Sequence, residues 1–446
     1  MTASGELQHA PPKGRAVMPP TCGLPPGPPM PRQAQTVLFW SRVDWFLRSC
    51  ERRYGSAFTL RVFPWGTLVI VSDPADIKTV FTGDPGVWRA GESYEPLAPL
   101  VGERSVVVLD DAEHLHMRKR MLPAFHGDAV RRYEQVIEEI AAEEVAGWPI
   151  GRPIATVERM RAITLEVMLR AVIGAQEPRR LDELRLALAA AVQLQPLMLL
   201  MWAWAPLKGI GPWRAFNGRL EHARSLLRQE IEHRRADPSV AERSDVLSVL
   251  ISAEELDDVE LLDQLATLLL AGHDTTTIAL AWALERLVRH PSALARARED
   301  DRYLDAVIKE ALRLRPVLPA VARQVAAPVQ IGGYTVPAGT TVMPCIRLVH
   351  LSADLYPDPS SFRPERFLEG QGHGYAWIPF GGGTRRCAGA AFASFQMRIV
   401  LRTILARAEL RADRPRDESV RNKHITLVPG RGGRVIKTRP LPREPA

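Results

Sequence analysis

Cysteine is scarce in this chain of 446 residues, and its four cysteines include no CxxC pair. Their wide spacing argues against zinc ribbons and structural disulfides and favours a reducing compartment. The N-terminal sequence MTASGELQHAPPKGR contains no apolar core of the kind that a secretory signal needs, so neither a signal nor an N-terminal anchor is predicted. We therefore expect a cytoplasmic protein. The cysteines are Cys22, Cys50, Cys345 and Cys387.

Neither sign of charge dominates the chain, because 58 Lys and Arg residues stand against 51 Asp and Glu residues, a net charge of +7. An excess this small over so long a chain is not typical of a nucleic-acid-binding protein. It fits a local basic face that receives an acidic partner or an anionic cofactor. Hydrophobic residues make up 46% and charged residues 24% of the chain, which excludes wholesale disorder and predicts an ordinary packed core.

Long uninterrupted apolar runs are also missing, and a transmembrane helix needs about 20 residues. The segment 197–207 (LMLLMWAWAPL) is too short. It is expected to be a core helix or packed loop, with an apolar lid over a substrate channel or peripheral contact with a membrane as the alternative. The helical pattern over 259–289 is long enough, at about 46 Å, but His273 and Asp274 lie at its centre. Such residues are costly in lipid, so we predict a long helix through the middle of the protein with a functional centre.

The remaining patterns are mostly helical, with two short β regions. A hairpin is predicted from the runs 57–63 and 67–71 around Pro64-Trp65-Gly66, and a second β region from Gly332-Gly333 and 337–342. Length alone would give about three domains. Helical patterns cover 128–148, 157–173, 182–195, 213–234, 259–289 and 393–408.

The most informative motif is Phe380-Gly-Gly-Gly383-Thr-Arg385-Arg-Cys387-Ala-Gly389. Its glycines let the backbone turn tightly and approach a bulky group, and Cys387 stands at the start of an apolar helical run. Helix-start amides and the neighbouring Arg385 and Arg386 are expected to lower the thiol pKa and leave a thiolate. On these residues alone, an inert buried cysteine is an equal alternative.

The motif matches FxxGxRxCxG, the haem-thiolate signature of the cytochrome P-450 family, at every fixed position. The resemblance extends from about Tyr54 to Val435, with the family's landmarks in the family's order. It implies a mainly α fold of the soluble bacterial type, in which a large helical domain with a long central helix and a small β-rich region covers 36–446. The Pro-rich segment 1–35 is then a flexible lead-in. Cys387 would be the axial ligand of the iron of haem b, and Phe380, Arg385 and Gly389 would contact the cofactor.

Two further motifs resemble family landmarks around the cysteine loop. Glu310 and Arg313 lie three residues apart on one helix face, which alone would indicate a surface ion pair. They resemble the family's ExxR pair, and Arg366 resembles the arginine that completes a Glu-Arg-Arg network. The resemblance implies that this network braces the Cys387 loop, which is a structural role.

The centre of the long helix, Ala271-Gly-His-Asp274-Thr275-Thr, resembles the family's [AG]Gx[DE]T[ST] motif. The resemblance implies that Ala271 and Gly272 contact haem, with Gly272 leaving room for the macrocycle and its bound O₂. It also implies that Asp274 relays protons and that Thr275 hydrogen-bonds the iron-bound oxygen. His273 departs from the small or apolar residue usual there. It either packs away from the haem or points into the pocket and shapes substrate choice.

Haem carries two propionates, and four side chains are predicted to hold them. His114 and Arg118 share a helix face and resemble the family's HxxxR pair, with His116 as the weaker alternative to His114. Arg323 resembles the propionate-binding arginine that follows the ExxR helix, and Arg385 is the fourth donor. One departure is the stretch between Pro291 and Glu310, which is shorter than in relatives and affects surface shape more than chemistry.

By resemblance the reaction is monooxygenation, in which one atom of O₂ enters a lipophilic small molecule and the other leaves as water. The expected pocket walls, 94–108, 268–275, 317–322 and 425–427, are mostly apolar and select no single substrate. A peroxide-driven enzyme and a non-catalytic haem sensor are the alternatives. The chain has no flavin or iron–sulfur pattern, so the predicted donor is a ferredoxin with its NAD(P)H-dependent reductase. The basic residues expected to receive it are Arg118, Lys119, Arg120, Arg131, Arg132 and Arg386.

Overall fold

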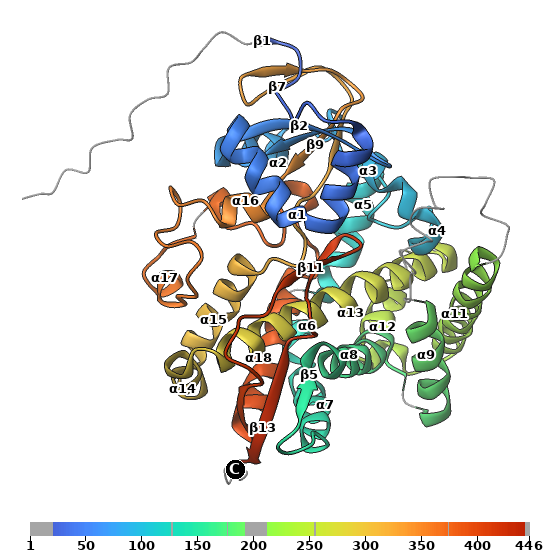
Figure 1. Ribbon diagram of the computed structural model, residues 1–446. Helices are drawn as coiled ribbons and strands as arrows, with labels where there is room; N and C mark the ends of the chain where they lie inside the picture. Colours follow the sequence, from blue (N-terminus) through green and yellow to red (C-terminus); the bar gives the residue numbers. More distant parts are fainter. Residues whose placement is uncertain are drawn as a thin grey trace, which may run out of the picture.

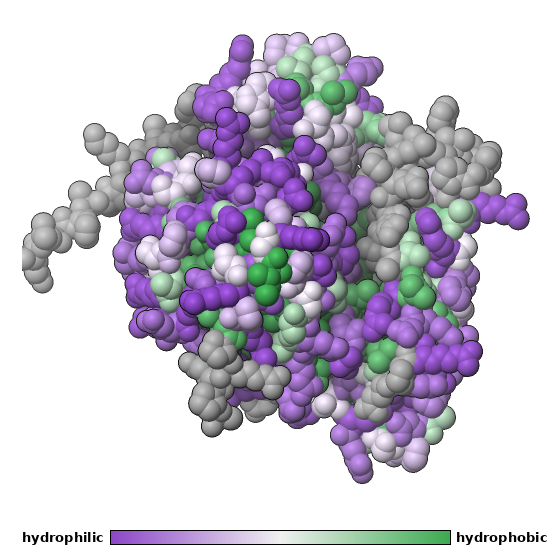
Figure 2. Space-filling model, turned by 60° about the horizontal axis from the view of Figure 1, so that its bottom comes forward, coloured by the Kyte–Doolittle hydropathy of each residue, from purple (hydrophilic) through white to green (hydrophobic). Residues whose placement is uncertain are grey.

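The computed structural model describes residues 21–125, 128–175, 177–191, 212–253, 256–372 and 374–441. The apolar segment 197–207 lies outside these residues, so the alternatives for it stay predictions. In the described part of the chain, no helix combines the length and the apolar character needed to cross a membrane. Figure 2 shows hydrophilic side chains over most of one face, with apolar ones in scattered patches.

Helices form most of the structure (Figure 1). The α-helices are α1 Arg32–Tyr54, α2 Pro74–Thr82, α3 Gly91–Tyr94, α4 Ala98–Val101, α5 Asp111–Met121, α6 Asp128–Arg131, α7 Glu134–Ala146, α8 Thr156–Val167, α9 Pro178–Ala191, α11 Pro212–Arg235, α12 Val246–Ser252, α13 Asp258–Val288, α14 Pro291–Glu299, α15 Asp301–Leu314, α16 Ile346–His350, α17 Glu365–Leu368 and α18 Ala390–Arg407. Shorter turns are the 3₁₀ helices η1 Glu95–Leu97, η2 Leu122–Phe125, η5 Val240–Glu242, η6 Gly374–Ala376 and η7 Gly383–Arg385, and the π-helix η3 Met168–Ile173.

The strands gather in small sheets, mostly at one end of the molecule (Figure 1). A five-stranded sheet has the order β2-β3-β9-β6-β4, in which β3 and β9 are parallel and Leu68 pairs with Thr341. The strands are β1 Thr21–Cys22, β2 Ala57–Val62, β3 Gly66–Val71, β4 Trp88–Arg89, β5 Pro153–Ala155, β6 Arg323–Val325, β7 Val329–Ile331, β8 Tyr334–Val336, β9 Thr341–Pro344, β10 Ala408–Ala412, β11 Val420–Lys423, β12 Thr426–Pro429 and β13 Arg434–Pro440. The β2–β3 pairing confirms the hairpin predicted around Pro64-Trp65-Gly66.

The long central helix is α13, and its bounds confirm the predicted helix to within one residue at each end. It begins with a capping box, in which the Asp257 side chain accepts from the Glu260 N–H and the Glu260 side chain accepts from the Asp257 N–H. Its C-terminal half, from Thr276 to Val288, is buried throughout. This half is enclosed because α13 packs against α8, α15 and α18 (Figure 1).

Part of the N-terminal segment expected to be flexible is fixed on the sheet. Thr59 of β2 donates its N–H to the Pro26 carbonyl at 2.9 Å and its hydroxyl to the Pro25 carbonyl at 2.6 Å. The Gln35 amide donates to the Met30 carbonyl at 3.0 Å. Prolines lack an N–H but keep the carbonyl, so this Pro-rich segment can still bind the sheet as an acceptor. Ordered structure therefore begins before residue 36.

Candidate functional site

The loop that carries Cys387 lies between η7 and the start of α18. The Cys387 N–H donates to the Phe380 carbonyl at 2.9 Å, which closes the loop, and the Cys387 side chain keeps accessible surface. Gly383 has φ +64°, and a Cβ there would lie 1.7 Å from the Phe81 carbonyl oxygen. Glycine is therefore required at this position, because the loop passes directly against the end of α2.

The acidity of the Cys387 thiol differs from the prediction. The protein atoms packed around the loop restrict hydration of the thiol and raise the pKa of Cys387 above its ordinary value, although the residue keeps accessible surface. The Gly389 N–H and the positive charges of Arg118 and Arg386 act in the opposite direction, but the loss of hydration outweighs them. The expectation of a thiolate from the helix start and arginines alone is thus wrong. A thiolate here needs a further positive charge, such as a metal ion bound to the sulfur.

The Glu-Arg-Arg group lies together in the core beside this loop. Arg313 donates to both Glu310 carboxylate oxygens, at 2.7 and 2.8 Å, and Arg366 Nε donates to one of them at 3.1 Å. All three side chains are fully buried. A buried carboxylate between two guanidinium groups is a strong, directional network. It joins α15 to α17 and the segment that precedes the cysteine loop.

A residue that the sequence analysis missed connects this network to the loop. His350, at the end of α16, is completely buried, and its carbonyl accepts from Arg313 Nη1 at 2.6 Å. Its Nε2 accepts the N–H of Ile378, two residues before Phe380, at 2.9 Å. Burial and the charge of Arg313 lower the pKa of His350 to about 3, so the ring is neutral and can act as an acceptor.

The four predicted propionate-binding side chains form one cluster. His114 and Arg323 are each about 4% exposed. Burial and the positive charges of Arg385, Arg118 and Arg323 lower the pKa of His114 to about 3, so all three guanidinium groups lie within electrostatic range of this ring. The neutral imidazole can donate one N–H. The cluster thus combines three cations with one neutral donor.

Only one of these cations has a carboxylate partner among the described residues. Arg385 donates to Asp110 and to the carbonyls of Val106 and Leu109. Arg323 donates only to the neighbouring Ala322 carbonyl, at 2.7 Å, and lies 5.6 Å from the Phe81 ring centroid. Among the residues that the structure describes, no hydrogen bond or ion pair is present for Arg118. A buried guanidinium without a counter-charge is costly, which indicates an anionic ligand.

Asp110 is the second residue that the sequence analysis missed. Besides Arg385, its carboxylate accepts the N–H groups of Ala90, Gly91 and Glu92 at 2.8 to 3.0 Å. These bonds hold the start of α3 against the segment that leads into α5. Asp110 directly precedes α5, where an acidic residue normally caps the helix, but here its side chain makes no cap bond.

Asp274 and Thr275, at the centre of α13, make contacts with different parts of the structure. The Thr275 hydroxyl donates to the Ala271 carbonyl at 2.5 Å, and Ala271 itself is exposed. Asp274 pairs with Arg161 of α8 at 3.3 Å, with side chains 22% and 39% exposed. Asp274 therefore connects the middle of α13 to a solvent-accessible arginine.

The structure decides between the two alternatives for His273 and shows which residue packs against Gly272. His273 is buried, and its Nδ1 lies 2.8 Å from the Thr164 hydroxyl of α8, so it packs away from Ala271 and Thr275. A Cβ at Gly272 would lie 2.9 Å from Met168 Cε of η3. Gly272 thus allows close packing of α13 on η3, and its predicted contact with the macrocycle stays a prediction.

Comparison with known proteins identifies this arrangement. The family model described as Cytochrome P450 matches residues 25–433. The chain belongs to the cytochrome P450 family. It is 47% identical over 436 residues to "Putative cytochrome P450 135B1" of Mycobacterium tuberculosis, covering 93% of this chain and 91% of that protein. It is 40% identical to "Putative cytochrome P450 135A1" of the same species, covering 94% and 97%.

Solved structures show the same fold. The structure titled "Retinoic acid bound cyanobacterial CYP120A1" has a TM-score of 0.81 at 24% identity and covers 94% of this chain and 100% of its own. The haem domain of cytochrome P450DA has a TM-score of 0.79 at 22% identity, covering 93% and 97%. The expected cytochrome P450 fold, mainly α with a small β-rich region, is confirmed.

Cytochromes P450 are haem-dependent monooxygenases, and the residues present here fit a haem. The unpaired cations of the His114 cluster match the two negative propionates of this group. Cys387 offers an accessible sulfur on a loop fixed by Gly383 and the Phe380 carbonyl. The protein is therefore a cytochrome P450 monooxygenase whose own side chains are complementary to the family's cofactor.

Proposed function

We propose that this cytochrome P450 uses haem b, whose iron the Cys387 sulfur would bind, to insert one atom of O₂ into a lipophilic small molecule. The observation that supports this most is the cluster of His114, Arg118 and Arg323, in which neither arginine forms an ion pair with a carboxylate of the described residues. When bound through a cysteine thiolate, haem supplies the chemistry that favours cleavage of the O–O bond. Phe380 and Gly389 shape the loop from which Cys387 reaches it.

The four basic-cluster residues would share the two propionates. Arg323 and Arg118 have free donors for carboxylates, and neutral His114 adds one N–H. Arg385 is already paired with Asp110, so only part of its guanidinium group would remain to bind a propionate. The Glu310 network and His350 keep the loop in place and take no part in the chemistry.

Asp274 and Thr275 would deliver protons at the centre of α13. Because the Thr275 hydroxyl donates to the Ala271 carbonyl, its oxygen lone pairs remain to accept a hydrogen bond. Asp274 is next to Thr275 and reaches Arg161 at 3.3 Å, which is partly exposed. This gives a carboxylate that can exchange a proton with solvent and pass it inward. Such an acid–alcohol pair favours a reaction that uses O₂ and electrons over one that uses peroxide.

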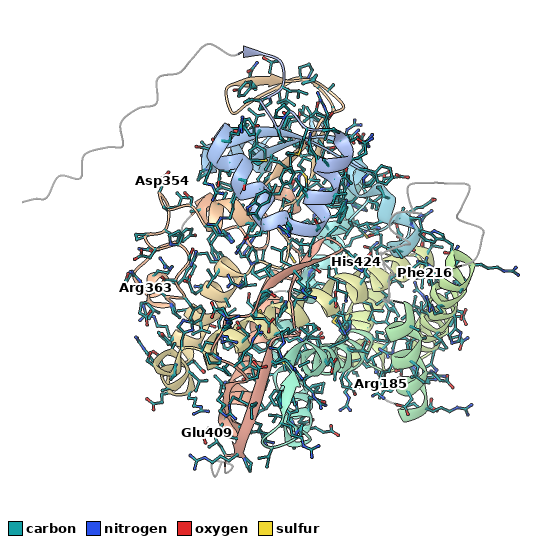
Figure 3. All side chains as sticks on the ribbon, viewed as in Figure 1. Arg185, Phe216, Asp354, Arg363, Glu409 and His424 are labelled. Atoms are coloured by element: carbon teal, nitrogen blue, oxygen red, sulfur yellow. The ribbon has the colours of Figure 1, made fainter. Side chains whose placement is uncertain are left out.

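A cavity of about 330 Å³ supports a lipophilic substrate. It brings together parts of three predicted pocket walls, represented by Tyr94, Leu318 and Ile425, and also reaches the α1 and β2–β3 tryptophans. Figure 3 labels His424, another lining residue, at the β11–β12 turn below α1. The cavity includes Ala322, next to Arg323 of the basic cluster. An apolar chamber whose wall continues into Arg323 fits a lipophilic compound, but the fourth predicted wall, 268–275 of α13, does not line it.

We further propose a ferredoxin and its NAD(P)H-dependent reductase as electron donors. Lys119, Arg131, Arg132 and Arg386 are exposed and offer a basic docking face near Cys387. Arg120, which the sequence places in this face, instead pairs with Glu260 at 3.6 Å. Charge reversal at Lys119 and Arg132 should weaken donor binding and reduce its salt dependence. Unchanged affinity and salt dependence would exclude this face.

The deciding experiment is the absorption spectrum of the reduced protein with carbon monoxide, for wild type and Cys387→Ser. A strongly red-shifted Soret band in wild type alone is expected for thiolate-bound haem. Fatty acids, terpenoids, steroids and aromatic polyketides would then be screened by the iron spin state, and hits by turnover with ferredoxin and reductase. A spectrum indifferent to Cys387, or turnover with peroxide alone, would overturn the proposal.

A further inference from the structure

A second cavity, of about 500 Å³, adjoins the proposed substrate cavity, with which it shares Val43 and Asn422. It is enclosed by α1, the end of α15, α16 and the segment that enters β11. Figure 1 shows α1 between α16 and β11, and α1 contacts both elements. None of the residues assigned above to the cofactor lines this cavity.

The cavity wall contains a half-buried arginine that forms no ion pair with a carboxylate of the described residues. Arg315, which follows α15, donates only to the carbonyl of its neighbour Leu314, at 3.1 Å, and its Nε has no acceptor. Its guanidinium carbon lies 5.3 Å from the Trp282 ring centroid. Burial, with the positive charges of Arg347 and Arg286, lowers the pKa of Arg315 to about 10. It remains a cation at neutral pH, and the negative charges of Glu285 and Asp417 compensate it only in part.

The carboxylates around the cavity are committed to other arginines. Asp44 accepts from Arg347, and Asp417 accepts from Arg286 at 3.1 Å. Glu418 accepts the Arg431 N–H at 2.9 Å, and Arg414 lies 3.7 Å from it. Positive charge is therefore left over in the wall. The charged lining residues are Arg42, Arg48, Arg315, Arg347, Asp44, Asp417 and Glu418.

The second arginine without an ion pair among the described residues is Arg42, on the α1 side of the cavity. It is exposed, and neither an ion pair nor a side-chain hydrogen bond is present for it in the described structure. The backbone of α1 departs from helical geometry at this residue, with φ −139° and ψ 45°. The helix is thus interrupted where it borders the cavity, and Arg42 and Arg315 face the same space from α1 and from the end of α15.

We propose that this cavity binds a phosphate group, either free or as the terminal group of a small phosphorylated molecule, with Arg42 and Arg315 as its ligands. Two unpaired guanidinium groups match a dianion better than a carboxylate, and their planar donors suit phosphate oxygens. The volume leaves room for a small organic part beyond the phosphate. Occupancy would join α1 to the end of α15, the helix that also carries Glu310 and Arg313.

The test is calorimetric titration of the full-length haem-loaded protein with inorganic phosphate and with ribose 5-phosphate, at constant ionic strength set by chloride. Arg315→Gln and Arg42→Gln should each weaken binding roughly tenfold or more, as expected for loss of a charge-assisted hydrogen bond. The matched control is Arg302→Gln, which removes an exposed arginine from the other end of α15. It should bind phosphate as wild type does.

Tighter binding of ribose 5-phosphate would identify a phosphorylated molecule as the ligand, and tighter binding of inorganic phosphate would identify the free ion. No saturable binding of either probe would overturn the proposal, as would equal losses in the Arg302 control. If Arg315→Gln does not fold, exposed Arg42 decides alone. The Soret spectrum with carbon monoxide, recorded on the same samples, reports the Cys387 site separately, so failure here is distinguishable from failure of the proposed reaction.

Discussion

Replacing Arg366 with methionine should destabilise the protein far more than the same change at Arg363, three residues earlier. Arg366 is fully buried, and its Nε donates to Glu310 at 3.1 Å. Its removal leaves the buried Glu310 carboxylate with Arg313 as its one remaining guanidinium partner. Removing one partner from a buried ion pair costs about 3 to 5 kcal/mol, and because Arg313 still makes two bonds we expect about 3 kcal/mol.

Arg363 provides the matched control on the same segment. Its side chain pairs with Glu369, but the two are 42% and 53% exposed. An exposed pair of this kind contributes at most about 1 kcal/mol. Arg363 also gives its backbone N–H to Glu310, at 2.9 Å, and the substitution leaves that bond in place. The two variants therefore differ mainly in the loss of the buried guanidinium.

The assay is urea unfolding of the haem-loaded protein, followed by far-ultraviolet circular dichroism and by the Soret band. Arg366→Met should shift the midpoint strongly at an unchanged slope, because the exposed surface on unfolding is the same. The Soret midpoint should shift together with the circular dichroism midpoint, since Arg313 and His350 connect this network to the cysteine loop. Equal losses in the Arg366 and Arg363 variants would refute the reasoning.

Three further predictions concern pH, protons and glycine. The pKa of His273 is lowered to about 4 and that of His350 to about 3. Below pH 6.5 the unfolded state therefore binds protons that the folded state excludes. The folded state thus loses stability as the pH falls. His273→Asn should reduce this slope by about 1.4 kcal/mol per pH unit between pH 6 and pH 4 in urea titrations, and an unchanged slope would contradict it. Asp274→Asn should slow turnover roughly a hundredfold with the carbon monoxide spectrum intact; full activity would exclude the proton role. Gly383→Ala should abolish haem binding because its Cβ would meet backbone, whereas Gly272→Ala meets only the flexible end of Met168 and should leave the Soret band unchanged. A shifted band in Gly272→Ala would support its predicted contact with the macrocycle.

The elements that the sequence predicts well are those fixed by local chemistry. The capping residues Asp257 and Glu260 and the stop before Pro291 define α13 within the sequence itself. The Pro-rich segment before residue 36 shows the opposite case. Its composition predicts flexibility, but its carbonyls bind Thr59, more than thirty residues away, and composition carries no information about that contact.

The candidate site shows the same contrast between features set by local sequence and features set by tertiary contacts. The motifs locate Cys387, Glu310 and Arg313, because each has a fixed spacing, but they do not show what surrounds them. His350 acts only because the fold brings it to Arg313 and Ile378, which are 37 and 28 residues away. The thiol pKa follows the same logic, since the helix start and arginines are local while the burial that outweighs them is tertiary. A motif therefore predicts which residue serves the chemistry, whereas its ionisation and its support depend on neighbours that only the folded chain supplies.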